Sequence, residues 1–265
     1  MIIFLPLFIF GLGLLVGSFL GVVIVRFHTG RSIVKGRSKC DRCNRTLEWY
    51  EMLPVVSFLA LRGKCRTCKL HLSFQHPIVE LCVAISFVLL YIHTILLGLP
   101  LALSVLYFIF SATVASVLIV VFAYDLKHKI IPDRLVYILG ALSLGMIAFV
   151  TYTAHSFIGL GDALIAGPLV ATPFFLIWLI SKGRAMGFGD VKLALVLGWL
   201  LGIRAGVVMI FVSFWIGGIV GLFLLALSKK HSLKSEIPFA PFLIIATALV
   251  VLGSLTQYSF LQLWF

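Results

Sequence analysis

Charge is what this sequence lacks most. Asp, Glu, Lys and Arg together make up 11% of its 265 residues, and acidic residues number only nine. Soluble globular domains carry about 25% charged residues, so a water-soluble chain is excluded. Apolar residues fill the difference: 62% of the chain is hydrophobic and the mean hydropathy is +1.19. This composition is typical of a polytopic membrane protein.

Several catalytic motifs are also missing. The chain has no Gly-x-Ser-x-Gly nucleophile elbow and no His-Glu-x-x-His zinc site. Of its five cysteines, four stand in two CxxC motifs and the fifth, Cys82, stands alone in an apolar run, where we expect it to be buried in lipid. These absences exclude the common serine, cysteine and zinc hydrolase designs and leave carboxylates as the candidate catalytic groups.

Long apolar runs are what the sequence does contain. A helix needs about 20 apolar residues to cross roughly 30 Å of hydrocarbon. The first run lacks a basic n-region and a cleavage site, so we interpret it as a membrane helix and not as a signal peptide. We therefore expect an all-α polytopic membrane protein with about eight transmembrane helices. The predicted spans are about residues 2–25, 78–97, 101–124, 134–153, 162–181, 190–203, 205–228 and 241–263.

The basic residues report topology. The formal net charge is +12, and eleven of the 21 Lys and Arg lie between Arg26 and Lys69. Basic loops stay in the cytoplasm. Eight helices with both termini outside then place every Lys and Arg except Arg204 on the cytoplasmic side. The partner implied by the charge is the lipid bilayer, and nucleic acid is not predicted as one.

The composition divides the chain into three parts. Residues 1–25 form the first transmembrane helix, residues 26–76 form a polar, basic cytoplasmic domain, and residues 77–265 form the membrane core. The small domain is inserted directly after the first helix. It is too short to hold itself together well by apolar burial alone.

The inserted domain carries a metal-binding pattern. Two CxxC motifs are separated by 21 residues, and four thiolates in two knuckles match tetrahedral zinc, as in a zinc ribbon. Two disulfides are the alternative, which a reducing cytoplasm disfavours. Four sulfur ligands leave no open position for water, so the predicted zinc is structural. The predicted ligands are Cys40, Cys43, Cys65 and Cys68.

The first helix carries a stripe of small residues. Gly13, Gly17 and Gly21 repeat every four residues and so share one face. This spacing predicts close approach of another helix. The same letters loosely resemble a dinucleotide fingerprint, but no strand precedes them.

Two aspartates stand where apolar runs meet the cytoplasmic side. Asp125 ends one run in YDLKHKIIPD, and Asp190 begins another in MGFGDVKL, directly behind Gly187 and Gly189. Ionisable groups at such positions are costly and are functional hypotheses by default. The glycines would let the backbone bend and a substrate strand approach. We predict that the two aspartates meet as a catalytic pair, because two close carboxyls share one proton and can activate water.

Neighbouring charges have different expected roles. Lys127 and Lys192 each stand two residues past an aspartate, a helical spacing that does not bring side chains face to face. We expect them to extend to the surface and support the motif through their field. Asp162, in a GLGD that superficially repeats GFGD, lies on the outer side and is predicted to be a helix N-cap.

Glu80 follows Pro77 at the start of the second membrane helix. One interpretation is that the negative charge of Glu80 is stabilised by the positive end of the helix dipole. The other is a part in binding cofactor or substrate at the cytoplasmic surface, which makes Glu80 a weak candidate for a cofactor site.

These motifs, taken together, resemble a known family. GSFLGVVIVR, the paired CxxC, LRGKCRTC, HPIVE, YDLKHKIIPD, MGFGDVKL and IPFAPFL occur in the same order as in the type IV prepilin peptidases, which are GxGD membrane aspartyl proteases. The resemblance covers nearly the whole chain. It implies that Asp125 and Asp190 are the catalytic pair and that the four CxxC cysteines bind zinc.

The resemblance also implies a function. Such enzymes lie in the bacterial inner membrane and cut the leader from prepilins or pseudopilins on the cytoplasmic side, for pilus assembly or protein secretion. Most also methylate the new N-terminus with S-adenosylmethionine, an activity for which this sequence shows no binding motif of its own. Three alternatives stay open: a GxGD peptidase without methyl transfer, a proton-coupled transporter, and a zinc-dependent scaffold.

Overall fold

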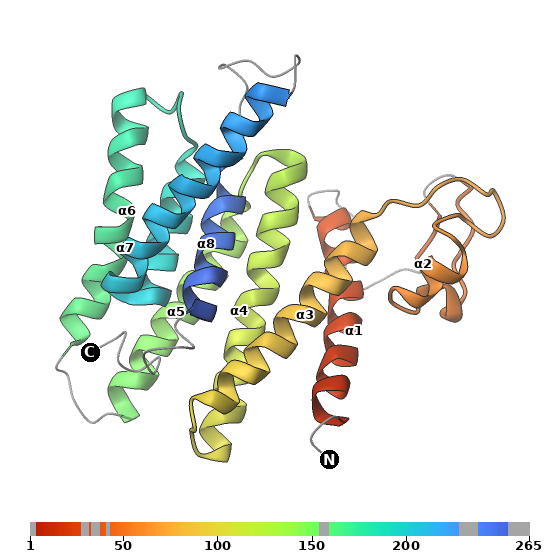
Figure 1. Cartoon of the computed structure of the whole chain (residues 1–265), viewed down its shortest axis with the longest axis horizontal. Coiled ribbons are helices and arrows are strands. Elements are labelled where there is room, and N and C mark those ends of the chain that lie inside the picture. Colours follow the sequence, from red (N-terminus) through yellow and green to blue (C-terminus); the bar gives the residue numbers. More distant parts are fainter. Residues whose placement is uncertain are drawn as a thin grey trace. The chain divides into compact units, whose positions relative to one another are not determined.

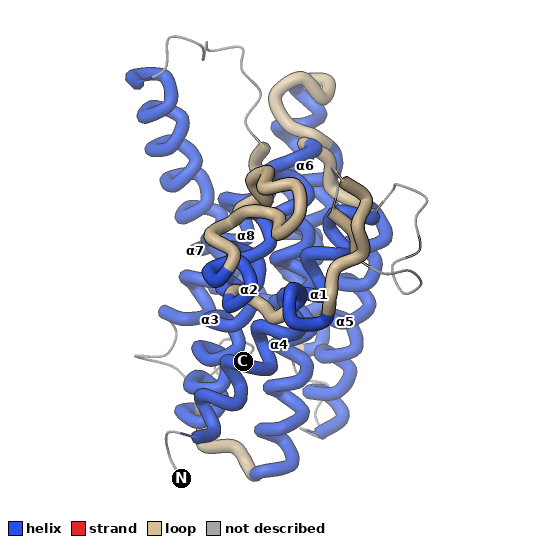
Figure 2. The backbone as a smooth tube through the Cα atoms, turned by 90° about the vertical axis from the view of Figure 1, so that its right-hand side faces the viewer, coloured by secondary structure: helices blue, strands red, loops and turns tan. Residues whose placement is uncertain are grey.

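The computed structural model describes residues 4–27, 32, 38–40, 43–153, 159–227 and 238–253. The chain divides into two compact units, residues 1–123 and 124–265, each of which is described by itself. Within the described residues, regular structure is helical apart from two isolated β-bridges (Figure 2). The predicted all-α fold is therefore confirmed.

The helices follow the predicted apolar runs closely (Figure 1). They are α1 (Phe4–Arg26), the 3-10 helix η1 (Trp49–Met52), α2 (Val56–Ala60), α3 (Gln75–Leu96), α4 (Leu101–His128), α5 (Asp133–Thr153), α6 (Leu160–Ser181), α7 (Phe188–Leu227) and α8 (Ala240–Gly253).

Six helices in the described part of the chain are long and apolar enough to cross a membrane: α1, α3, α4, α5, α6 and α7. The longest of them, α7, contains a non-helical residue, Gly202, with φ 76° and ψ 177°. This bend separates the two runs that the sequence predicts at 190–203 and 205–228. The eighth predicted run corresponds to α8, and its portion beyond Gly253 lies outside the described residues.

In the first unit, α1 packs against α3 through its glycine face. A Cβ atom built on Gly13 would lie 2.5 Å from the Cα atom of Ala84, and one on Gly17 would lie 2.6 Å from the Cα atom of Glu80. Carbon atoms need about 3.5–4.0 Å, so only glycine permits this approach. The predicted close-packing face is confirmed.

Aromatic contacts join α3 to α4 in the same unit. The Tyr107 hydroxyl lies 3.2 Å from Nδ1 of His93, and both side chains are buried. Phe108 makes edge contacts with Phe87 and Tyr91. Buried polar groups are expected to have hydrogen-bond partners, and Tyr107 and His93 provide partners for each other inside the membrane-spanning part of the two helices.

In the second unit, the first half of α7 is the most enclosed element. It packs against α5, α6 and α8. Gly198 lies so close to α6 that an added Cβ atom would be 2.7 Å from the backbone oxygen of Ala166. Trp199 donates its indole N–H to the Leu164 carbonyl at 2.9 Å, which fixes α7 against α6. The enclosed half of α7 is the one that begins with Asp190.

Candidate active site and metal centre

Asp125 lies in the last turn of α4. Its side chain is 4% exposed, and its Oδ2 atom has no hydrogen-bond partner among the described residues. The helix ends just after it, because Lys129 takes a left-handed φ of 54° and donates its N–H to the Asp125 carbonyl at 2.8 Å. A buried carboxylate oxygen without a partner is costly and is typical of a functional group.

Asp190 lies in the first turn of α7. Its side chain is 8% exposed, and its backbone N–H donates to the Gly187 carbonyl at 3.2 Å. The charge of Asp125 acts on the Asp190 carboxyl, so the end of α4 and the start of α7 bring these two side chains into one electrostatic environment. Two buried carboxyls that interact in this way favour a shared proton over two negative charges.

The glycines of the GFGD turn provide clearance for neighbouring atoms. Neither Gly187 nor Gly189 adopts a positive φ, so the turn does not depend on the backbone freedom of glycine. A Cβ atom on Gly189 would lie 3.2 Å from the Cβ atom of Ile131, whereas one on Gly187 would meet Oδ2 of Asp190 at an ordinary 3.7 Å. Gly189 therefore lets the turn between α4 and α5 close against the start of α7.

The two motif lysines are placed differently. Lys192 pairs with Asp133 at the start of α5, with 2.7 Å between Nζ and Oδ1, and its ammonium group lies 5.4 Å from the ring centroid of Phe188. Lys127 is exposed in the last turn of α4. Among the described residues, neither lysine forms an ion pair with Asp125 or Asp190.

Asp162 belongs to a separate place in the fold. It is exposed in the first turn of α6, where the N-cap position is held by Gly159 with a left-handed φ of 90°. The prediction that Asp162 is itself the N-cap is wrong, because the helix starts one turn earlier than the apolar run suggests.

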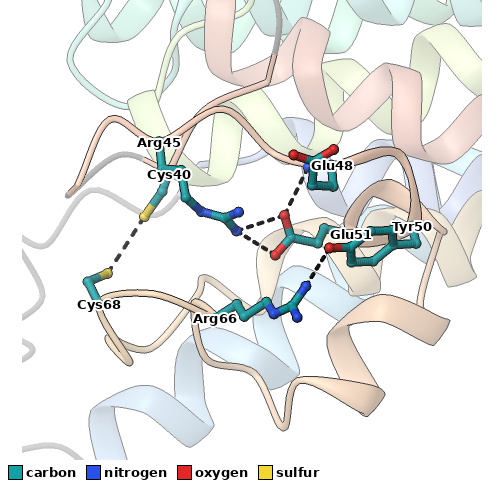
Figure 3. Close-up of polar contacts among 7 residues, drawn as sticks. All are labelled: Cys40, Arg45, Glu48, Tyr50, Glu51, Arg66 and Cys68. Atoms are coloured by element: carbon teal, nitrogen blue, oxygen red, sulfur yellow. Dashed lines mark hydrogen bonds and ion pairs between the residues drawn. The ribbon is translucent and has the colours of Figure 1, made fainter.

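The four CxxC cysteines converge in the first unit. The Sγ atoms of Cys40, Cys43, Cys65 and Cys68 all lie within 4.8 Å of one another. Figure 3 shows Cys40 and Cys68 facing each other, with Sγ atoms 3.9 Å apart. A tetrahedral site with Zn–S bonds of about 2.3 Å requires sulfurs about 3.8 Å apart, so the donor set fits zinc.

The described residues around both CxxC motifs make the same pair of backbone hydrogen bonds. In each, the backbone N–H of the first cysteine donates to the carbonyl of the residue five positions later. The carbonyl of that cysteine accepts the N–H of the residue four positions later, which has a left-handed φ. An isolated antiparallel bridge closes each turn. The shared donor–acceptor pairs are Cys40 to Arg45 at 3.0 Å, Cys65 to Leu70 at 2.9 Å, Asn44 to Cys40 at 2.9 Å and Lys69 to Cys65 at 3.0 Å.

Thiolate formation is favoured in one of these turns. Backbone N–H groups of Cys68 and Thr67 point at the Cys65 sulfur and lower the pKa of that thiol to about 6. Zinc binds the thiolate form of cysteine. In the same turn, burial and the neighbouring cysteine side chains raise the pKa of the Cys68 thiol to about 11, so Cys65 is the cysteine of this turn that is prepared as a thiolate.

Polar contacts fasten η1 to both cysteine turns (Figure 3). Arg45 donates to the buried Glu51 carboxylate, at 2.7 Å to Oε2, and the Glu48 N–H donates to the same oxygen at 2.9 Å. The Glu48 N–H is the main cause that lowers the pKa of Glu51. Arg66 donates to the Tyr50 hydroxyl and lies over its ring. Sequence patterns did not identify this network.

Glu80 has a structural contact. Because α3 begins at Gln75, Glu80 lies in the second turn and does not cap the helix. Its Oε2 atom accepts the backbone N–H of Val55 at 2.8 Å, and Val55 adopts an unusual φ of 58° for a β-branched residue. Glu80 therefore holds the chain between η1 and α2 in place.

Cys82 is exposed on α3. On a helix long and apolar enough to span a membrane, an exposed face is a face toward lipid. Its position in lipid stays a prediction, and Cys82 is not part of the cluster of four sulfurs.

Comparisons with known proteins now define the class. A model of the bacterial Peptidase A24 N-terminal domain matches residues 11–94, and a model of the type IV leader peptidase family matches residues 112–222. The chain is thus a multi-pass membrane peptidase with two family regions. No solved structure matches it.

Curated relatives identify the family. The chain is 34% identical over 241 residues to the prepilin leader peptidase/N-methyltransferase of Bacillus subtilis, covering 89% of this chain and 88% of the relative. It is 33% identical to the Myxococcus xanthus protein of the same name, covering 86% of this chain and 66% of the relative. The Pseudomonas putida protein of that name is 32% identical, with 91% and 88% covered. The chain belongs to the type IV leader peptidase family.

Proposed function

We propose that this chain cleaves the leader peptide of type IV prepilins or pseudopilins at the cytoplasmic face of the bacterial inner membrane, with Asp125 and Asp190 as its catalytic pair. The observation that carries the proposal is that two buried aspartates lie at the end of α4 and the start of α7, with the Oδ2 atom of Asp125 lacking a hydrogen-bond partner among the described residues. The family and the names of the relatives support the substrate class.

The pair acts through one water molecule and one shared proton. The ionised carboxylate takes a proton from water as the water oxygen attacks the scissile carbonyl carbon. The protonated carboxyl donates its proton to the carbonyl oxygen, which gives a neutral diol. The diol then collapses, the leaving nitrogen takes a proton from the pair, and the carbon–nitrogen bond breaks.

The described residues around the pair have supporting roles. The tight contact of Gly189 with Ile131 and the Lys192–Asp133 ion pair both join the start of α7 to the turn between α4 and α5. Catalysis by two carboxyls depends on their separation, so these two contacts favour a fixed geometry. Lys127 remains at the surface, where it raises the local positive potential.

Zinc is proposed as a structural ion of the inserted domain. Cys40, Cys43, Cys65 and Cys68 would hold it, and it would cross-link two turns in a segment with almost no apolar core. A full set of sulfur ligands gives the ion no part in peptide hydrolysis.

Methyl transfer is proposed as a second activity. The names of the relatives include N-methyltransferase, and S-adenosylmethionine would supply a methyl group to the new N-terminal amine. Glu80, the sequence candidate for this site, already accepts the Val55 N–H, and no other described residue is assigned to the cofactor. A peptidase that lacks methyl transfer is the second candidate function.

A proton-coupled transporter is disfavoured by position. Transporter carboxylates lie near the bilayer midplane. Asp125 and Asp190 instead lie at the ends of their helices, in the last turn of α4 and the first turn of α7.

The test uses purified protein, a prepilin peptide that spans the cleavage site, and S-adenosylmethionine, with products weighed by mass spectrometry. Asp125→Asn and Asp190→Asn should each abolish cleavage, while Asp162→Asn, a matched aspartate in the first turn of α6, should retain it. Cleavage at the wild-type rate in either dyad variant contradicts the proposed pair. A product without the mass of one added methyl group supports the peptidase-only alternative.

A further inference from the structure

The inserted segment has an unusual distribution of apolar side chains. Between Leu47 and Phe74, a stretch that the structure describes completely, no large apolar side chain is buried. The buried positions there are instead Glu51, Pro54, Gly63 and Cys65. A water-soluble domain places its large apolar residues inside.

The exposed apolar residues gather on η1 and α2. Five of them form what we call the apolar surface, with exposed fractions of 71%, 44%, 43%, 59% and 68% in chain order. They are Trp49, Met52, Leu53, Val56 and Leu59.

The connection to α3 places this surface beside the first turns of a helix long and apolar enough to span a membrane. Val55, between η1 and α2, bonds through its N–H to Glu80 at 2.8 Å. Glu80 lies five residues beyond Gln75, the first residue of the membrane-spanning helix α3. At 1.5 Å per residue, the contact lies about 7.5 Å along that helix. The apolar surface is therefore tied close to the end of a membrane-spanning helix, which is where an interfacial element lies.

The charge of the segment matches an anionic surface. Four basic side chains directly after α2 are exposed. They are Arg62, Lys64, Arg66 and Lys69. The ion pair within residues 43–76 is Arg45–Glu51. Arg66 is held by Tyr50 and its charge acts on Glu51, so the other three supply the positive charge that no acidic side chain pairs in that described stretch.

We propose that η1 and α2 form an interfacial anchor. Trp49, Met52, Leu53, Val56 and Leu59 insert between the headgroups of an anionic lipid leaflet, and the neighbouring basic residues contact lipid phosphates. Tryptophan is enriched at membrane–water interfaces because its ring is apolar and its N–H is polar. The anchor holds the cysteine cluster at the membrane surface, and this inference does not depend on the peptidase proposal.

The test measures tryptophan fluorescence of the full chain in vesicles. The signal of Trp49 is the difference between wild type and Trp49→Phe. In vesicles with phosphatidylglycerol, lipids brominated near the headgroup should quench this signal at least twofold more than lipids brominated deep in the chain. Without phosphatidylglycerol, headgroup-level quenching should fall at least twofold.

A matched pair of variants separates apolar contact from charge. Leu59→Asp and Ala60→Asp add the same charge at adjacent exposed positions of α2, but only the first removes a large apolar side chain. Leu59→Asp should open Trp49 to aqueous acrylamide, and Ala60→Asp should do so less. If Leu59→Asp does not fold, the quenching of the wild-type Trp49 signal still decides the question.

Four results would overturn the proposal or a part of it. Quenching of Trp49 by acrylamide but by no brominated lipid means that the surface faces water. Protection from both quenchers means that protein covers it. Protection that develops only after a prepilin peptide is added means that it binds substrate. Equal quenching in neutral vesicles would overturn the requirement for anionic lipid.

Discussion

The ion pair between Lys192 and Asp133 gives a prediction about catalytic geometry. It is 2.7 Å long and joins α7, at a position two residues past Asp190, to the start of α5. Lys192→Met and Asp133→Asn each remove it. The charge exchange, Lys192→Asp with Asp133→Lys, restores opposite charges at the same two positions.

The expected magnitude is small. The side chains are 29% and 52% exposed, and ion pairs with that exposure contribute roughly 0.2–1 kcal/mol. A loss of about 1 kcal/mol corresponds to about a fivefold change in an equilibrium or rate constant. We therefore expect each single variant to lower kcat by up to about fivefold, with KM unchanged, because the pair positions the start of α7 and does not contact the substrate.

The assay is steady-state cleavage of a prepilin peptide, with kcat and KM measured separately. The charge exchange should recover at least half of the lost kcat. Arg134→Gln is the control, since it removes an adjacent exposed positive charge and leaves the pair intact. Single variants with wild-type kcat, or an exchange that recovers nothing, would refute a positioning role for the pair.

Three further predictions concern the first unit. Gly17→Ala places a Cβ atom 2.6 Å from the α3 backbone and should lower the free energy of unfolding by about 1–3 kcal/mol in a thermal unfolding assay. Gly11→Ala is the control, because no atom lies within 4 Å of its added Cβ atom, and it should not lower stability. Equal unfolding midpoints for the two variants would contradict the close packing of α1 on α3. Because the pKa of Glu51 is lowered in the folded state, its carboxylate stabilises the fold above the unfolded pKa of about 4.5 and loses this effect as pH falls through the folded value. The difference in melting temperature between wild type and Glu51→Gln should therefore be largest near pH 7 and should shrink below pH 4.5, and a difference that grows toward acid would be inconsistent with it. Cys65→Ser should lower bound zinc from one ion per chain, measured by plasma mass spectrometry, and wild-type zinc content in this variant would exclude a four-sulfur site.

The membrane architecture follows from sequence because its signals are local. A run of apolar residues defines a helix without reference to any partner, and the observed helices match the predicted runs. The repeat of Gly13 and Gly17 predicts a close-packed face for the same reason. It does not identify α3 as the partner, which depends on contacts distant in sequence.

The candidate site was predictable in part. Asp125 and Asp190 each mark the edge of an apolar run, and the charge distribution predicts that both lie on one side of the membrane. The ion pair of Asp133 with Lys192 was not predictable, because a contact between different helices leaves no periodic pattern. The sequence also suggested that Gly189 lets the backbone bend. In the structure Gly189 has no positive φ, and its lack of a side chain instead leaves room for Ile131.

Glu80 and Glu51 show a different limit of sequence reasoning. An isolated glutamate near a helix start permits several roles, and only the partner decides among them. For Glu80 that partner is the Val55 N–H, and for Glu51 it is Arg45 together with the Glu48 N–H. The boundaries proposed for the inserted domain, 26–76, stay a prediction, although α1 ends at Arg26 and α3 begins at Gln75.

The most direct measurement of the central claim is a double-mutant comparison of Asp125 and Asp190. Residues that act as one unit are strongly non-additive. Single-turnover cleavage of a prepilin peptide should be reduced as much by either Asp→Asn change alone as by both together. Reductions that multiply in the double variant, or substantial activity left in either single variant, would show that the two aspartates work independently and would contradict the shared-proton mechanism.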